Sequence, residues 1–213
     1  MTKKRSGKGD TYSSFADLAA HEEEGVSFRR RSVARASPVA VIAPHGGYIE
    51  PRTSQIAAAI AADDLSLYCF EGLIPGRGHG ALHITSALFD EPNGCELVAK
   101  AETAVAVHGR DNDGDPETVR LGGRDEKLRD AIGAELKRAG FKVSVAVGHM
   151  TGTDEANICN RGQSGAGAQL EIPLELRNRL RAASGSLNTF AAAVRAAITP
   201  YLAKPAAPAP AKK

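Results

Sequence analysis

Residues 39–47 read VAVIAPHGG, a run of β-branched and small apolar residues that ends at a histidine and two glycines. Such a run predicts a buried strand that stops in a glycine loop. Residues 103–109 repeat the pattern as TAVAVHG. If the two strands are parallel neighbours, His45 and His108 emerge at the same edge of the sheet, where ligands of open α/β sheets bind.

Strands and helices alternate along the remaining chain. The patterns predict further strands at residues 65–70, 82–89, 141–147 and 169–172, and helices at residues 13–24, 53–64, 124–138 and 186–203. This order predicts an α/β fold, a single-domain open mixed sheet flanked by helices. We place the domain at residues 11–203, between a basic tail (1–10) and a Pro/Ala-rich tail (204–213), both expected to be disordered.

Composition limits the possible partners. A chain of 213 residues with a net charge of +2, 5% aromatic residues and no tryptophan is a poor candidate for binding nucleic acid. No apolar run is long enough to span a membrane, and no signal peptide precedes the domain. Three cysteines at unrelated spacings fit a reducing compartment. We therefore expect a soluble, cytoplasmic monomer, released by cell lysis if it is phage-encoded.

Glu50 lies five residues after His45, across a tight turn that can return its carboxylate to the imidazole. Two histidines and one carboxylate with an open position form a catalytic zinc set, and iron(II) is the alternative metal. Either histidine alone is more often a hydrogen-bonded surface residue than a ligand. The matched pair, His45 and His108, together with Glu50, favours a metal.

Other polar residues stand near these strand ends. Glu171, in the short strand at 169–172, can take a proton from a water, although an outward-facing, salt-bridged Glu is equally compatible with the pattern. His83 reads as a third imidazole ligand, a substrate contact or a polar residue of an edge strand. Arg52, Arg110 and Arg161 can each clamp a substrate carboxylate or remain surface charges. His79 and His149 carry no pattern.

The chain resembles the poly-γ-glutamate hydrolase family, whose relatives are often labelled phage-related replication proteins. The matching segments run in order through most of residues 12–180 and are residues 12–20, 41–61, 68–72, 82–92, 106–109, 121–124 and 156–177. The family is similar in fold to zinc carboxypeptidases. The resemblance therefore implies an open mixed sheet flanked by helices.

The same resemblance implies a role for single residues. His45, Glu50 and His108 match the zinc ligands, and Glu171 matches the general base. Asn160 and Arg161 look like an anion-binding pair for glutamyl carboxylates, which leaves His83 as an outer-sphere or substrate residue. Tyr48 and Arg52 stand where the family commonly has glycine, and both lie beside the metal loop.

We therefore expect a zinc-dependent amide hydrolase that cleaves γ-glutamyl bonds in an anionic polymer or peptide. One alternative is a hydrolase of another anionic amide, such as a peptidoglycan stem. Another is a non-enzymatic replication or nucleic-acid accessory protein, motivated by the basic residues 1–8 and 29–31.

Overall fold

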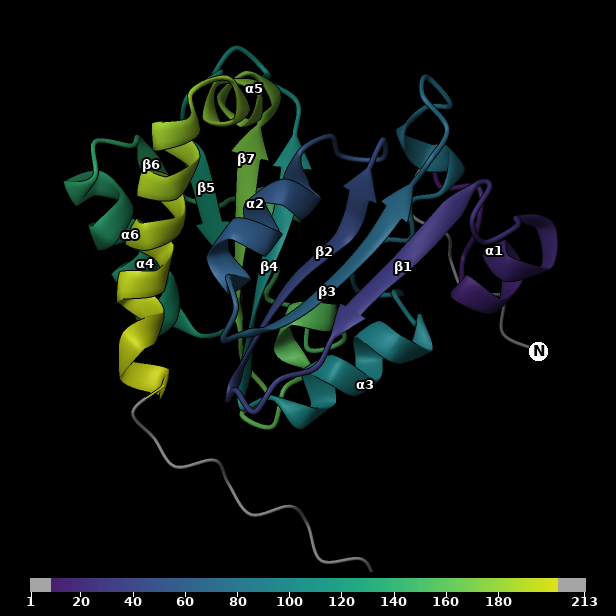
Figure 1. Ribbon diagram of the computed structural model, residues 1–213, viewed down its shortest axis with the longest axis horizontal. Coiled ribbons are helices and arrows are strands. Elements are labelled where there is room, and N and C mark those ends of the chain that lie inside the picture. Colours follow the sequence, from purple (N-terminus) through teal and green to yellow (C-terminus); the bar gives the residue numbers. More distant parts are fainter. Residues whose placement is uncertain (1–8, 203–213) are drawn as a thin grey trace, which may run out of the picture.

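The computed structural model describes residues 9–202, which form one seven-stranded sheet with helices on both faces (Figure 1). The strand order is β1-β3-β2-β4-β7-β5-β6. The strands are β1 (Phe28–Val33), β2 (Val39–Gly47), β3 (Ser66–Gly72), β4 (Thr103–Arg110), β5 (Val119–Gly122), β6 (Val143–Val145) and β7 (Ala168–Pro173). Of the expected tails at residues 1–10 and 204–213, residues 1–8 and 204–213 lie outside the described residues, and Gly9 and Asp10 are described with the domain.

The sheet is mixed, as expected. Strands β3, β2, β4 and β7 run parallel at its centre, and β1 and β5 pair antiparallel with β3 and β7. The edge strand β6 pairs parallel with β5. Because β2 and β4 are adjacent and parallel, their carboxyl ends lie at the same edge of the sheet.

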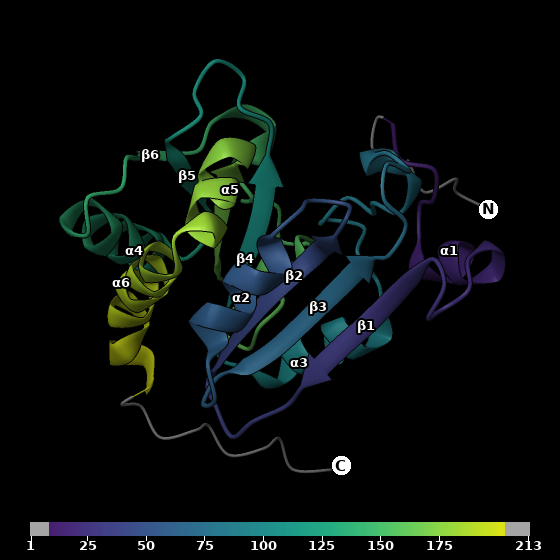
Figure 2. The ribbon, with the colours of Figure 1, turned by 45° about the horizontal axis from the view of Figure 1, so that its top comes forward.

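Helices lie on both faces of the sheet (Figures 1 and 2), and a layer of buried apolar side chains lies on each face. Alternate residues of β2 divide between them, since Val39 and Val41 face one layer and Ala40 and Ile42 the other. The first layer is covered by α2 (Thr53–Ala61), α4 (Glu126–Arg138), α5 (Leu174–Ala182) and α6 (Ser184–Leu202). The second is covered by α1 (Phe15–His21) and α3 (Pro92–Lys100). Short 3-10 turns lie at His79–Ala81, Gly148–Met150 and Ile158–Asn160.

The strand predicted at residues 82–89 is wrong, because this segment forms an irregular loop. Its apolar residues Leu82, Ile84 and Phe89 are buried, which explains the strand-like pattern. Its polar groups bond to side chains instead of to a neighbouring strand: the Thr85 amide donates to Asp10, and the Ile84 carbonyl faces a ring nitrogen of His45. The segment is therefore a partly buried loop that contacts His45 at the end of β2.

The sequence patterns also missed four elements: β1, β5, α3 and α5. Strand β1 contains three consecutive arginines, which read as a charge run. Helix α3 starts at Pro92 with Glu91 as its N-cap, and the Glu91 carboxylate accepts the amides of Asn93 and Gly94. Within residues 9–202, no helix has the length and apolar character that a bilayer crossing requires.

Candidate metal centre and cleft

The end of β2 is irregular, and this irregularity places His45. The register with β3 shifts between Ala43 and Gly46, and pairing with β4 ends at Ile42. Pro44 sits in this bulge and has no amide hydrogen to give to a ladder. Strand β2 thus separates from β4 where His45 begins, and the imidazole is 2% exposed.

Glu50 returns to His45 through a short turn closed by the Glu50 amide, which donates to the His45 carbonyl at 2.8 Å. Glu50 Oε1 lies 3.3 Å from His45 Nδ1. Its other oxygen accepts the Gly109 amide at 2.8 Å, so the carboxylate also contacts the end of β4. The turn that the sequence suggested therefore brings both groups together.

His108 completes the arrangement from β4. His108 Nδ1 lies 3.3 Å from His45 Nδ1 and 3.7 Å from Glu50 Oε2. Ligands about 2.0–2.1 Å from a tetrahedral zinc are separated by about 3.3–3.4 Å. The two separations from His45 Nδ1 match that edge length and the one from His108 to the other Glu50 oxygen exceeds it by a few tenths of an ångström, so this donor set can close around a zinc ion with a small adjustment.

The protonation states of His45 and Glu50 agree with a metal site, whereas the carboxylates of Glu50 and Glu171, working against burial, raise the pKa of His108. His45 Nε2 lies 2.8 Å from the Ile84 carbonyl, which makes Nε2 the donor and leaves Nδ1 bare. Burial, followed by the neighbouring His83, lowers the pKa of His45 to about 4. Burial would raise the pKa of Glu50, but the surrounding imidazoles of His45, His108 and His79 hold it well below its ordinary value. A neutral imidazole and an ionised carboxylate are the forms that bind a metal.

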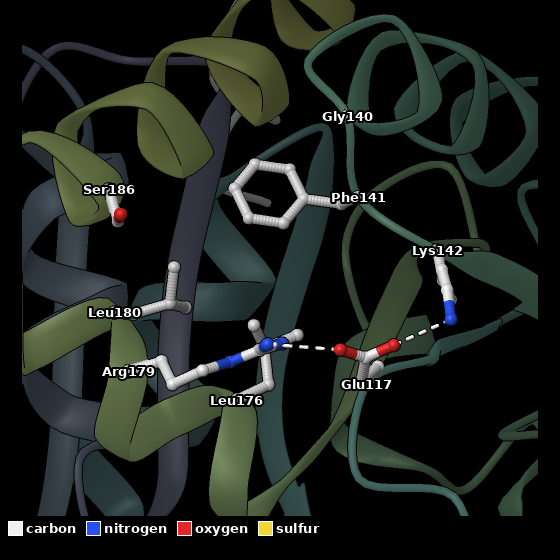
Figure 3. Close-up of a pocket in the computed structure, with 8 residues that line it drawn as sticks. All are labelled: Glu117, Gly140, Phe141, Lys142, Leu176, Arg179, Leu180 and Ser186. Carbon is white, nitrogen blue, oxygen red and sulfur yellow. Dashed lines mark hydrogen bonds and ion pairs between the residues drawn. The ribbon is translucent and has the colours of Figure 1, made fainter.

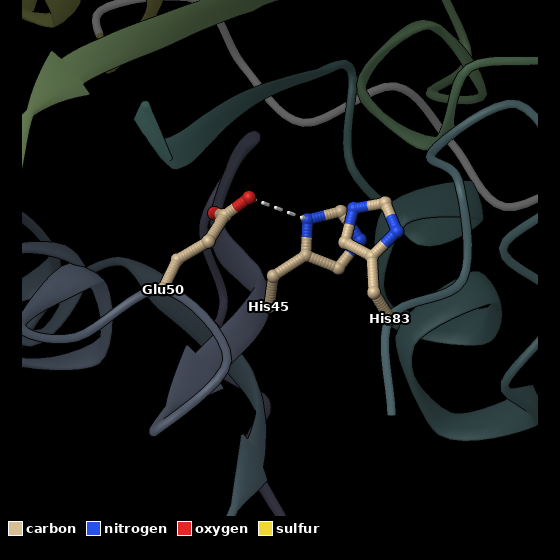
Figure 4. Close-up of side chains that lie close together, drawn as sticks. All are labelled: His45, Glu50 and His83. Atoms are coloured by element: carbon tan, nitrogen blue, oxygen red, sulfur yellow. Dashed lines mark ion pairs between the residues drawn. The ribbon is translucent and has the colours of Figure 1, made fainter. Parts of the chain in front are cut away.

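Two further imidazoles approach this centre. The ligand atoms of His45, Glu50 and His83 all lie within 4.8 Å of one another (Figure 4). The His83 ring lies against that of His45, with centroids 3.9 Å apart, and against that of His79, with centroids 4.2 Å apart. His79 Nε2 lies 3.5 Å from Glu50 Oε1. The loop from 72 to 83 thus covers one side of the centre.

Glu171 lies beside His108 because the two residues are register partners on β7 and β4. Gln169 Nε2 donates to Glu171 Oε1 at 3.1 Å, and Asn157 Nδ2 donates to Gln169 Oε1 at 3.1 Å. Burial and the nearby negative charge of Glu50 raise the pKa of Glu171 to about 7. A carboxyl group with this pKa is suited to taking up and releasing protons at neutral pH.

A cleft of about 1030 Å³ joins these groups and is lined by His45, Glu50, His83, His108 and Glu171. A second pocket of about 320 Å³ lies elsewhere, against α5 (Figure 3). Its cations, Lys142 and Arg179, both pair with Glu117, and none of its lining residues is a histidine. The histidine and carboxylate groups that could bind a metal or transfer protons therefore line the larger cleft and not the pocket against α5.

The arginines expected to bind substrate have different surroundings. Arg110 lines the cleft, but its Nη1 and Nη2 atoms donate to the carbonyls of residues 111, 112, 115 and 118 and to the Asp115 carboxylate. Arg52 is the N-cap of α2, with φ at +81°. Glycine adopts this left-handed conformation without the strain that arginine meets there.

Asn160 and Arg161 do not line the cleft. The Asn160 amide donates to the carbonyls of Gly152 and Asp154, and its oxygen accepts the Arg124 and Gly167 amides. The Arg161 guanidinium donates to the carbonyls of residues 87, 89 and 156. As placed, both side chains hold loops together, so the structure does not bring this pair to the metal centre.

The sequence patterns did not reveal three residues of the cleft region. His79 lies in a glycine-rich loop without spacing to suggest a ligand. Asp10, assigned to the N-terminal tail, has a side chain that is 6% exposed and lies 2.8 Å from His83. Arg177 is 3% exposed and donates to the carbonyls of residues 51, 110 and 172. No local signal identifies these contacts, because each joins distant parts of the chain.

Comparison with protein families gives a match over residues 12–193 to the family described as poly-gamma-glutamate hydrolase. The SPβ prophage-derived UPF0714 protein YoqZ of Bacillus subtilis (strain 168) is 35% identical over 189 residues, covering 87% of this chain and 65% of that protein. The UPF0714 protein YmaC of the same strain is 34% identical, covering 81% of this chain and 72% of that protein. The chain thus spans about two thirds of the length of these relatives.

Two solved structures are similar over most of the chain. A bacteriophage poly-gamma-glutamate hydrolase superimposes with a TM-score of 0.84 and 32% identity, covering 90% of this chain and 98% of that one. The zinc-free apo form of YndL superimposes with a TM-score of 0.81 and 28% identity, covering 89% and 98%. The expected fold is therefore confirmed by both.

Proposed function

Because the chain belongs to the poly-γ-glutamate hydrolase family, we propose that it is a zinc-dependent hydrolase of γ-glutamyl amide bonds. The observation that carries this proposal is the convergence of His45 Nδ1, His108 Nδ1 and the Glu50 carboxylate, whose contacts are 3.3–3.7 Å long. Support for zinc also comes from the similar YndL structure, which is described as zinc-free.

In this proposal His45, Glu50 and His108 hold the metal. A bound zinc ion lowers the pKa of its water towards ~7 and polarises a substrate carbonyl. Glu171 accepts the proton of the attacking water and returns it to the leaving amine. Gln169 and Asn157 keep the Glu171 carboxyl group directed into the cleft through their two hydrogen bonds.

The cleft is lined by two guanidinium groups and by five carboxylates, those of Glu50, Asp111, Asp113, Asp154 and Glu171. The buried guanidinium groups of Arg110 and Arg177 line the cleft; their terminal nitrogens donate to backbone carbonyls and, for Arg110, to the Asp115 carboxylate, whereas Arg110 Nε has no hydrogen-bond partner among the described residues. In this proposal Arg110 and Arg177 are the cationic groups of the cleft that can attract a substrate carboxylate. Arg52, Asn160 and Arg161 are proposed to contribute less to substrate binding than Arg110 and Arg177. His83, which lines the cleft, is proposed to contact the substrate directly.

An assay with matched polymers tests the proposal. Zinc-loaded protein is incubated with γ-linked polyglutamate, α-linked polyglutamate and a peptidoglycan stem peptide, and new amino termini are counted. We expect cleavage of the γ-linked polymer and little of the α-linked one. Glu171→Gln should retain zinc and lose cleavage. Preference for the stem peptide would assign the chain to the other anionic amide, and no cleavage of any substrate would refute the proposal.

A further inference from the structure

The guanidinium group of Arg177 donates to three backbone carbonyls in separate parts of the site. Arg177 belongs to α5, which follows β7 directly and lies at the carboxyl ends of β4 and β7 (Figure 1). Its Nε donates to the Ile172 carbonyl at 3.0 Å, its Nη1 to the Pro51 carbonyl at 2.5 Å and its Nη2 to the Arg110 carbonyl at 3.0 Å. Arg177 is only 3% exposed, so water does not readily replace these bonds.

Each of these carbonyls is close in sequence to a group of the site. They belong to the residues directly after Glu50 and Glu171 and to the second residue after His108. The ladder between β4 and β7 holds His108 beside Glu171, but β2 stops pairing with β4 at Ile42, before the turn that bears Glu50. Arg177 therefore joins that turn to β4 and β7 beyond the point where the sheet does so.

The backbone at Gly109 lies between this guanidinium group and the metal-binding residues in the network of contacts. A Cβ at position 109 would lie 2.5 Å from Cζ of Arg177, so the guanidinium group packs directly on the backbone there. The Gly109 amide donates to Glu50 Oε2 at 2.8 Å, and Gly109 follows His108 in the chain. A displacement of Arg177 therefore reaches the backbone that fixes both Glu50 and His108.

We propose that Arg177 is a positioning residue, which fixes the distances between the metal-binding groups by holding the turn after β2 against β4 and β7. The inference rests on the proposed function for the identity of the metal, but the contact between Glu50 and Gly109 that it explains involves no metal. Charge alone predicts the opposite result on substitution, because a guanidinium group repels a nearby cation and its removal would strengthen zinc binding. Weaker zinc binding after neutralisation of Arg177 therefore reports position and not charge.

Competition with a chelator measures zinc affinity and tests this role. Arg177→Met removes the charge and all three bonds and should weaken zinc binding by roughly 10–100-fold. Arg177→Lys keeps the charge but lacks the planar fork that reaches three carbonyls, and it should weaken zinc binding by roughly 10-fold. Zinc binding as tight as in the wild type, or tighter, in either variant would overturn the inference.

Leu176→Ala is a matched control for the loss of stability. Leu176 is 2% exposed on the same helix, packs into the apolar layer and lines the pocket against α5 instead of the cleft. Its truncation should lower Tm and leave zinc affinity unchanged. An equal loss of zinc affinity in Leu176→Ala and Arg177→Met would mean that any destabilised form loses the metal, which contradicts a positioning role. Should Arg177→Met fail to fold, Arg177→Lys is compared with Leu176→Ala.

Hydrogen exchange of the ¹⁵N-labelled protein in the presence of a chelator gives a readout that needs neither zinc nor substrate. The bond to Glu50 protects the Gly109 amide. In both Arg177 variants this amide should exchange at least about 10-fold faster relative to the amide of Val105, at the centre of β4, whereas Leu176→Ala should change both amides alike. An unchanged ratio in the Arg177 variants refutes the inference. If the wild type binds no zinc, the proposed function fails and the exchange ratio alone decides the role of Arg177.

Discussion

Replacing Glu171 by glutamine should stabilise the zinc-free protein at alkaline pH. Burial raises the pKa of this carboxyl group to about 7 from an ordinary value of 4.5. At a pH between 4.5 and about 7, the Glu171 carboxyl group is protonated in the folded protein and ionised in the unfolded chain. The folded state binds more protons, so its stability falls as pH rises through this window.

The size of the effect follows from the shift. A change from 4.5 to about 7 corresponds to about 3 kcal/mol of unfolding free energy, since each pKa unit is about 1.4 kcal/mol. Glutamine at position 171 does not ionise, so the unfolding free energy of Glu171→Gln does not fall with pH for this reason. The stability difference between Glu171→Gln and the wild type should grow from less than about 1 kcal/mol at pH 5 to about 3 kcal/mol at pH 8.

Urea denaturation in the presence of a chelator measures this difference across the pH range. Glu175→Gln is a suitable control because Glu175 is exposed in the first turn of the adjacent helix α5. Its effect should be below about 1 kcal/mol and constant above pH 6. A pH-independent difference for Glu171→Gln, or a loss of stability at pH 8, would refute the view that burial raises the pKa of Glu171.

Three other substitutions test separate features of the site. His108→Ala should weaken zinc binding by roughly 100-fold or more in a chelator competition, whereas His21→Ala, on the exposed face of α1, should not change it. Arg52→Gly should raise unfolding free energy by about 0.5–1 kcal/mol, because its φ of +81° is strained for arginine; a lower Tm would contradict this reason. Gly109→Ala should lower it by about 1–3 kcal/mol, because the added Cβ would lie 2.5 Å from the buried Arg177 guanidinium; unchanged stability would show that the guanidinium moves freely.

Local patterns predicted the parts of the site that a single strand or turn determines. His45 and His108 each end a buried strand, and Glu50 lies within one turn of His45. We assumed from the sequence that the two strands are parallel neighbours, and the structure shows that they are. The metal-binding set could therefore be proposed from the residues alone.

Contacts between distant loops could not be predicted in the same way. Asp10 and His83 are 73 residues apart, and nothing near either residue signals the bond. The arginine residues Arg110 and Arg161 look like free charges in the sequence, but loop carbonyls occupy their guanidinium groups once the chain folds. Residues 82–89 have the apolar content of a strand, yet side-chain bonds replace a strand ladder there.

Anomalous diffraction at the zinc edge, from crystals grown with zinc, tests the proposed metal centre most directly. We predict one peak about 2.0–2.1 Å from His45 Nδ1 and His108 Nδ1 and at a similar distance from a Glu50 oxygen, with His83 Nε2 outside the ligand distance. A peak held by His83 in place of His108, or no peak in this cleft, would contradict the account.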